Sequence, residues 1–269
     1  MARLARTNEA KAPRRGVPLH PVEVRGGKTF IGARQIALGR RKDKRDPRDR
    51  LARSPALPRA VEAALPDHKY WADSTWRGDQ GAHPHCVAYS ATHRIENSPT
   101  TYPESGPVVD PTGVYARAQQ IDEWPGDDYD GTSVRAGAKV MLEKGFISEY
   151  QRITTLQDFI DFLRRPTSAG GGPVLIGIDW YTGMFSPVYE QDALGGYRWM
   201  LVPSGSAAGG HAVLVNGVNV PRMTFRILNS WGRDWGVDGR ASMRFSDMEN
   251  LLFSQGGDAW RYVEKRPVA

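Results

Sequence analysis

The feature that most limits the fold of this chain is a change of pattern near residue 165. Between residues 66 and 165, apolar side chains recur at helical spacing, and Ser, Thr or Asp residues stand where helices begin. Between residues 166 and 269, apolar runs of strand length alternate with Gly-rich turns. Because helices and strands are segregated along the sequence, we predict an α+β fold with a helical half followed by a β half.

Individual elements can be placed within these halves. The predicted helices run from Cys86 to about Glu96, onward from Pro111 after an Asp110 cap, from a Thr132 or Ser133 cap to Gly145, and onward from Thr155. The predicted strands span 173–178, 211–215, 224–228 and 241–245. Upstream of both halves, two short apolar runs flank Gly26-Gly27 and predict a β-hairpin.

Charge is distributed unevenly along the chain. Residues 1–60 contain 17 Lys and Arg against 5 Asp and Glu, whereas the remaining 209 residues contain 19 against 25. We therefore divide the chain into a basic N-terminal extension, residues 1–65, and a main domain, residues 66–269. The stretch 39–54 is charge-dense, nearly free of apolar residues, and expected to be a linker or a solvated strap.

This basic extension has two candidate partners. A basic stretch can bind nucleic acid, but no aromatic residue interleaves with the charges of residues 39–54. We therefore expect the extension to dock on the acidic body of its own chain. Such an attraction between net charges weakens as salt is added.

Length and composition restrict the class of protein further. With 269 residues, of which 40% are hydrophobic, the chain can bury a sizeable core. It has no membrane-spanning run of about 18 apolar residues. Its N-terminus lacks the apolar region of a secretory signal. The single cysteine cannot form an intrachain disulfide, which fits a reducing compartment, and we expect a cytoplasmic protein.

That single cysteine, Cys86, stands at the start of a predicted helix. It would lie near the positive end of the helix dipole and near unpaired backbone N–H groups. Both favour the thiolate and are expected to lower the thiol pKa below its free value of about 8.5. A lone cysteine is more often a small buried apolar residue. The catalytic interpretation therefore depends on partners elsewhere in the sequence.

Three separated motifs supply those partners. Gln80 precedes Cys86 by six residues, His211 opens a strand after a Gly-rich loop, and Asn229 begins Asn-Ser-Trp-Gly-Arg-Asp-Trp-Gly. His211 and Asn229 follow Cys86 by 125 and 143 residues. As a set, spread over about residues 66–269, the motifs resemble those of the papain-like cysteine peptidases. The resemblance implies that the helical half and a β-barrel-like half face each other across an active-site cleft.

The resemblance also implies a role for each motif residue in hydrolysing a peptide or protein substrate. Cys86 is the nucleophile, His211 is its imidazolium partner, and Asn229 orients the imidazole ring. Gln80 and the backbone N–H of Cys86 form the oxyanion hole. Trp231 covers the hydrogen bond between His211 and Asn229.

The same resemblance guides the expected binding residues. The positions expected to contact substrate are Gly131, Ile178, Gly209 and Trp231. No cofactor is implied. His83 and His85 are too close to Cys86, and too poor in further ligands, to form a tetrahedral zinc site, so no metal is expected. His83 and Val87 replace a disulfide cysteine and a tryptophan that are usual in the family.

Other functions remain open on the sequence alone. A papain-like fold that has lost catalysis would be a binding module, and the altered loop before Cys86 would then block the substrate. The same catalytic residues could instead transfer the acyl group to an amine, or act on an isopeptide. The basic extension could be a regulatory propeptide that shields the cleft, or a brace for the body.

Overall fold

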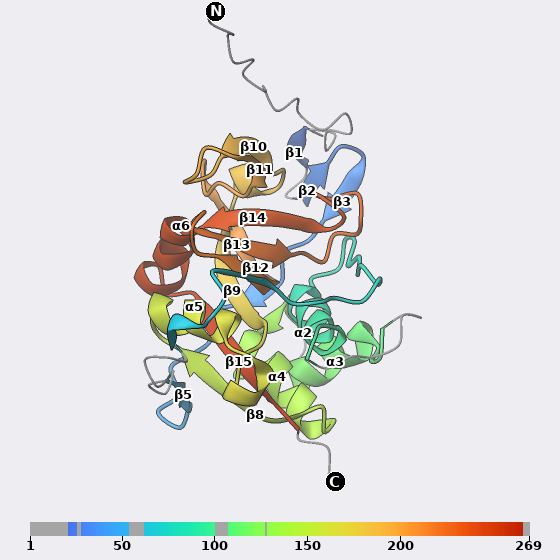
Figure 1. Ribbon diagram of the computed structural model, residues 1–269. Helices are drawn as coiled ribbons and strands as arrows, with labels where there is room; N and C mark the ends of the chain where they lie inside the picture. Colours follow the sequence, from blue (N-terminus) through green and yellow to red (C-terminus); the bar gives the residue numbers. More distant parts are fainter. Residues whose placement is uncertain (1–20, 26–27, 54–61, 100–106, 127, 266–269) are drawn as a thin grey trace, which may run out of the picture.

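The computed structural model describes residues 21–25, 28–53, 62–99, 107–126 and 128–265, and every structural statement below concerns these residues (Figure 1). They contain one large mixed sheet of ten strands. Nine strands follow one another in the order β10 (Val188–Gln191), β11 (Tyr197–Met200), β14 (Arg240–Arg244), β13 (Thr224–Leu228), β12 (Ala207–Asn219), β9 (Val174–Tyr181), β15 (Asp258–Glu264), β8 (Ile147–Ile153) and β5 (Leu51–Ala52). The tenth, β6 (His68–Tyr70), pairs with β12. Helices beside this sheet confirm the predicted α+β class.

Three of the helices begin at a local capping signal. The α-helices that lie wholly within the described residues are α2 (Cys86–Glu96), α3 (Pro111–Ile121), α4 (Val134–Glu143), α5 (Leu156–Arg164) and α6 (Phe245–Glu249). Asp110, Ser133 and Thr155 cap α3, α4 and α5 by accepting backbone N–H groups, as predicted. In this part of the chain, no helix combines the length and the apolar character that a membrane crossing needs.

The central strands of the sheet are buried on both faces. On one face, Leu175 of β9 and Leu214 of β12 belong to a core formed with α2, α3 and α4. On the other face, Ile176 and Val213 belong to a second core that includes residues of α5 and α6. Burial on both faces explains why the sequence of β9 is a continuous apolar run rather than an alternating one.

The sheet differs from the sequence-based prediction in several places, since β5, β6, β8, β10, β11 and β15 were not predicted. Strand β8 was not predicted, because its sequence is largely polar, yet it pairs with β15 along the sheet. The helical half thus contributes a strand to the large sheet. In addition, Phe245 begins α6 instead of ending the strand predicted at 241–245.

The described part of the N-terminal extension is built into the fold. The predicted hairpin is present as β1 (Val22–Arg25) and β2 (Lys28–Ile31), and β3 (Arg34–Ile36) adds to it; Gly26-Gly27 lies outside the described residues. Beyond it, β4 (Arg40–Arg41) pairs with β7 (Thr132–Ser133). Figure 1 shows the hairpin at one end of the large sheet and β5 at the opposite end.

We call residues 37–52, which connect these two ends, the strap. The expectation that residues 39–54 form a linker or a solvated strap is wrong at four of their described positions, the first of which is the buried Gly39. Arg40, Asp43 and Ala52 are only 6%, 7% and 0% exposed. The charges at positions 40 and 43 are buried because they have partners elsewhere in the fold, which a reading of local composition does not reveal. The structure of residues 1–20, also part of the basic extension, is not described.

Candidate active site

A buried histidine and a buried asparagine are joined across neighbouring strands. His211 lies in β12 and Asn229 directly follows β13, and both are fully buried. His211 Nε2 and Asn229 Oδ1 are 2.8 Å apart. The same Oδ1 also accepts the backbone N–H of Ser230 at 2.8 Å, which fixes the orientation of the amide. Nε2 therefore donates its proton to Asn229, and the neutral ring keeps a lone pair on Nδ1.

That Nδ1 atom is buried and has no hydrogen-bond partner within the described part of the chain. Two indole rings enclose the imidazole: the ring centroids of Trp180 and Trp231 each lie 4.7 Å from that of His211. Trp231 is fully buried, as its expected role requires, because water would compete for the bond between His211 and Asn229. The sequence did not indicate a role for Trp180, whose only signal is its place just after the predicted strand 173–178.

Cys86 lies at the first turn of α2, on the opposite wall. The backbone N–H groups of Ala212, Gly39 and Val87 lie near its thiol, and each favours a lower thiol pKa. Ala212 directly follows His211 in β12, and its carbonyl accepts Ser90 Oγ of α2 at 2.9 Å. The helix that carries the sulfur and the strand that carries the imidazole are thus in direct contact.

The protonation states of this site differ from the sequence-based expectation. Burial raises the pKa of the Cys86 thiol to about 11. Burial also lowers the pKa of His211 to about 4. The predicted lowering of the thiol pKa is therefore wrong in this covered state, because removal of water outweighs the helix dipole and the N–H contacts. At neutral pH the site holds a thiol and a neutral imidazole.

Gln80 is held in one orientation beside the sulfur-bearing helix. Its side chain is buried, and its Oε1 accepts Ser230 Oγ at 2.6 Å. Its Nε2 donates to the carbonyl oxygens of Ala37 at 3.0 Å and His83 at 2.8 Å. Ala37 belongs to the strap, so the amide predicted to stabilise an oxyanion already binds a peptide carbonyl.

Residues 37–40 of the strap, which we call the cleft segment, lie between the two walls. The N–H of Gly39 lies near the Cys86 thiol, and the Gly39 carbonyl accepts the backbone N–H of Thr132 at 2.9 Å. A Cβ atom on Gly131 would lie 2.2 Å from the Gly39 oxygen, and one on Gly209 would lie 3.1 Å from Leu38 Cδ1. Two of the expected substrate-binding positions therefore contact the strap.

Ile178, the third residue expected to line the substrate pocket, lies in the apolar core. Ile178 is fully buried in the apolar core and pairs with His211 between β9 and β12. It supports the histidine-bearing strand from within the core.

His85, next to the nucleophile, packs on the ring of Tyr115 at 4.0 Å and on that of His83 at 5.2 Å, measured between ring centroids. Within the described ranges, no group of three His, Cys, Asp or Glu residues is placed to hold a metal ion.

Comparison with known proteins gives no match to any family model or to any curated protein. Among solved structures, the chain is similar to xylellain, a cysteine protease from Xylella fastidiosa, at a TM-score of 0.64 and 23% identity, covering 85% of this chain and 96% of xylellain. It is also similar to procathepsin B S9 from Trypanosoma congolense, at 0.60 and 15%, covering 85% and 86%. The bromelain protease of Ananas comosus in complex with the inhibitor E64 gives 0.51 and 14%, covering 75% and 100%. The chain has the papain-like fold.

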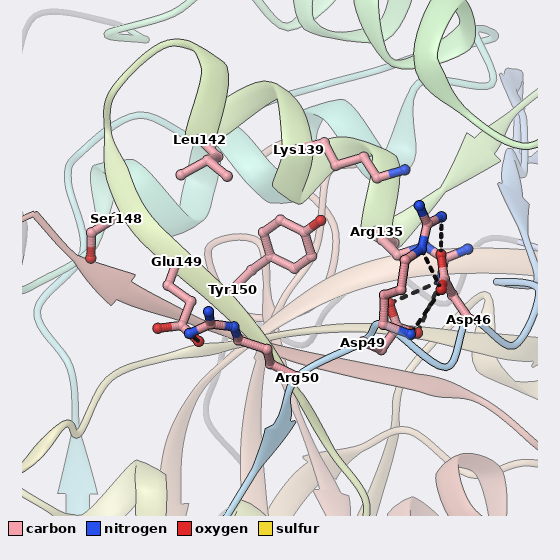
Figure 2. A pocket seen from close by; sticks show the side chains of 10 residues that line it. Asp46, Asp49, Arg50, Arg135, Lys139, Leu142, Ser148, Glu149 and Tyr150 are labelled. Atoms are coloured by element: carbon pink, nitrogen blue, oxygen red, sulfur yellow. Dashed lines mark hydrogen bonds and ion pairs between the residues drawn. The ribbon is translucent and has the colours of Figure 1, made fainter.

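Within this papain-like fold, residues 43–52 of the strap form an anchor segment away from the nucleophile. Asp43 Oδ2 accepts the indole N–H of Trp260 at 2.7 Å. Burial, and then the nearby Asp258 carboxylate, raise the pKa of Asp43 to about 7. Arg135 of α4 binds Asp49 at 2.9 Å, and its side chain is only 3% exposed. Figure 2 shows Arg135 pointing toward Asp46 and Asp49, with Arg50 and Glu149 farther along the same pocket.

Proposed function

We propose that this protein is a cysteine-type peptidase whose nucleophile is Cys86. The observation that carries the proposal is the extended peptide already present in the cleft. The carbonyl oxygens of Ala37 and Gly39 accept hydrogen bonds from Gln80 and Thr132. Every peptide has these backbone groups, so the same cleft is suited to an extended peptide substrate.

In the first half of the proposed reaction, His211 Nδ1 takes the proton of the Cys86 thiol. The thiolate then attacks the carbonyl carbon of the substrate, and a tetrahedral oxyanion forms. Gln80 Nε2 and the backbone N–H of Cys86 donate hydrogen bonds to that oxygen. Asn229 keeps the ring aligned through the bond to Nε2 and stabilises the imidazolium that results.

In the second half, the imidazolium of His211 returns its proton to the leaving amine, and the C–N bond breaks. A thioester between the acyl part of the substrate and Cys86 remains. Water then attacks the thioester while His211 accepts one of its protons. That proton goes back to the sulfur as the C–S bond breaks, which releases a carboxylic acid and restores the thiol.

The strap would hold this peptidase in a latent state. In the cleft, the N–H of Gly39 lies near the Cys86 thiol, while the Gly39 carbonyl is bound by the backbone N–H of Thr132. The strap also adds to the burial that keeps both the thiol and the imidazole uncharged. Two of the structural neighbours are a bromelain precursor and a procathepsin, which supports a blocking role for an N-terminal segment.

Hydrolysis of a peptide library by the full-length protein tests the proposed function. We expect Cys86→Ala and His211→Ala to abolish cleavage, and Gln80→Ala to slow it by about 100- to 1,000-fold, as for other oxyanion-hole donors. The matched controls, His68→Ala and Gln157→Ala, change exposed residues and should leave the rate unchanged. Intact mass after iodoacetamide treatment reports separately whether the Cys86 sulfur reacts.

The alternative functions give different results in the same assay. A binding module would bind peptides without cleaving them, and Cys86 would show no more reactivity than a buried thiol. An acyl transferase would join the acyl part of the peptide to an added amine, which mass spectrometry distinguishes from the free acid. Either result would replace the hydrolase assignment.

A further inference from the structure

A side chain of the strap fills a closed pocket beside the nucleophile. Arg40 directly follows Gly39, whose N–H lies near the Cys86 thiol. Its side chain is only 2% exposed, and its Nη2 atom binds the carboxylate of Asp258, which is 1% exposed. Its Nη1 atom binds Asp179 at 3.3 Å, and that side chain is 43% exposed. The pocket therefore has a buried acidic floor and a half-open acidic mouth.

Two glycines make room for this long side chain. A Cβ atom on Gly177 would lie 2.8 Å from Arg40 Nε, and one on Gly210 would lie 3.1 Å from Arg40 Cδ. Gly177 lies in β9, and Gly210 precedes His211 in β12. Asp258, at the floor, pairs with Gly177 at the start of β15. The pocket is thus made by strands of the body, next to the catalytic histidine, and not by the strap itself.

The charges of the pocket favour a cation. Besides Arg40, Asp258 accepts the backbone N–H of Asp43 at 3.2 Å and one side-chain nitrogen of Arg152 at 3.3 Å. The Arg152 side chain is 21% exposed, so it lies nearer to solvent than the carboxylate. A neutral side chain in place of Arg40 would leave the buried carboxylate without its nearest cation, which is strongly unfavourable.

The geometry also favours a guanidinium over an ammonium group. Two different nitrogens of one side chain reach two carboxylates, those of Asp179 and Asp258. A planar guanidinium presents its donors in such a fork, whereas the single nitrogen of a lysine is a point charge. Arginine therefore suits this pocket better than lysine does, and both suit it better than an apolar side chain.

The main chain at Arg40 is held by contacts that are independent of sequence. Arg40 pairs with Thr132 between β4 and β7, and the preceding carbonyl accepts the Thr132 N–H. We propose that this pocket selects the substrate: the enzyme prefers peptides that place an arginine where Arg40 now lies. The strap would then block the cleft because the Arg40 side chain occupies the pocket that the arginine of a substrate must enter. This inference rests on the proposed peptidase function, since it concerns the same cleft.

Fluorogenic tripeptides that carry arginine or citrulline, scanned over the three positions before the cleaved bond, test the pocket. Citrulline has nearly the shape of arginine but no charge. With the full-length protein and its Arg40→Ala variant, we expect kcat/KM at one position to favour arginine over citrulline by at least about tenfold. Asp258→Asn should abolish this preference. Asp179→Asn, at the half-exposed mouth, should reduce it, and the control Asp67→Asn, at an exposed position, should not change it.

The outcomes separate this inference from the proposed function. If peptides are cleaved but arginine and citrulline are equivalent at every position, the pocket does not select a cation and the inference is overturned. If no peptide is cleaved and iodoacetamide does not modify Cys86, even in the Gly39→Ala variant whose added Cβ atom forces the strap out of its place, the peptidase proposal fails and this inference fails with it. Should Asp258→Asn not fold, Asp179→Asn decides: an unchanged preference for arginine would contradict the pocket.

Discussion

The cleft segment and the anchor segment of the strap contact the body in different ways. In the cleft segment, Ala37 offers its backbone carbonyl to Gln80, a contact that any peptide can make. In the anchor segment, side-chain bonds add to the backbone pairing of β5 with β8: Asp43 accepts the indole N–H of Trp260, and Asp49 binds Arg135. The first set of contacts can be replaced by another peptide, whereas the second requires this particular sequence.

This difference indicates how a substrate reaches the nucleophile. A peptide that offers the same carbonyls, and an arginine for the acidic pocket, can displace the cleft segment one contact at a time. The anchor segment, which adds β5 to the edge of the large sheet, stays bound meanwhile. We therefore expect opening to be a local event in the cleft rather than release of the whole strap.

The largest effect is expected from Arg135→Met. The Arg135 side chain is 3% exposed, and it binds the carboxylates of Asp49 and Glu123. Its loss leaves these carboxylates without their cation, so the free energy of unfolding should fall by about 3–5 kcal/mol. Urea denaturation followed by tryptophan fluorescence measures this change.

Arg117→Met is the matched control for that variant. Arg117 and Glu143 form an ion pair whose side chains are 45% and 44% exposed. Exposed pairs contribute at most about 1 kcal/mol, so this variant should be nearly as stable as the wild type. If the two variants lose equal stability, the buried charges do not hold the anchor segment, and its difference from the cleft segment disappears.

A smaller effect is expected from Gly39→Ala, which acts on the cleft segment. The added Cβ atom would lie 1.9 Å from the backbone oxygen of Pro84, so the strap must leave its place. Iodoacetamide should then modify Cys86 about 10–100 times faster at a fixed pH, which corresponds to about 1.4–2.8 kcal/mol. Water returns to the thiol at the same time, so its pKa should fall from about 11.

The pH dependence of this labelling provides a second readout. In the covered wild type, the thiol pKa is raised above its unfolded value of about 8.5. The contribution of the Cys86 thiol to the free energy of unfolding is therefore complete below a pH of about 8.5. It is lost as pH rises through about 11, because the unfolded chain gives up the thiol proton more readily than the folded chain does. The control Gly113→Ala adds a Cβ atom only 3.4 Å from Asp110 Oδ2, an ordinary contact, and should leave the labelling profile unchanged. An identical profile for Gly39→Ala would mean that the strap does not cover the sulfur.

The sequence predicted those parts of the structure that depend on neighbouring residues or on a motif. The caps Asp110, Ser133 and Thr155 act within one helical turn, so their effect is visible locally. His211 and Asn229 were predicted as partners because each stands in a recognisable motif. The bond between them is present in the structure.

The sequence did not predict the features that depend on distant partners. Arg40 lies in a stretch so rich in charge that it indicates solvent exposure, and its partners Asp179 and Asp258 are 139 and 218 residues away. The raised pKa of Cys86 has the same origin, since a helix start alone implies a lowered value. Burial of a charge or a thiol is a property of the assembled fold, so it cannot be predicted from the local composition of the sequence.

The smallest effect is expected from salt, which separates net charge from buried contacts. Attraction between a basic arm and an acidic body would weaken with salt, because the Debye length is already about 10 Å at 0.1 M. The strap, however, is held by Arg40 and Asp258, which are 2% and 1% exposed. The more open pair, Arg50 with Glu149, has exposures of 73% and 27% and contributes little.

Raising NaCl from about 0.05 to about 0.5 M should therefore change the rate of Cys86 labelling in the wild type by less than about twofold, because buried pairs are screened weakly. Potassium glutamate at equal ionic strength is the control for specific binding of chloride. A rise of about tenfold in both salts would show that net charge holds the cleft segment in place. In that case the two segments would differ in position only, and the acidic pocket would not explain why the strap stays in the cleft.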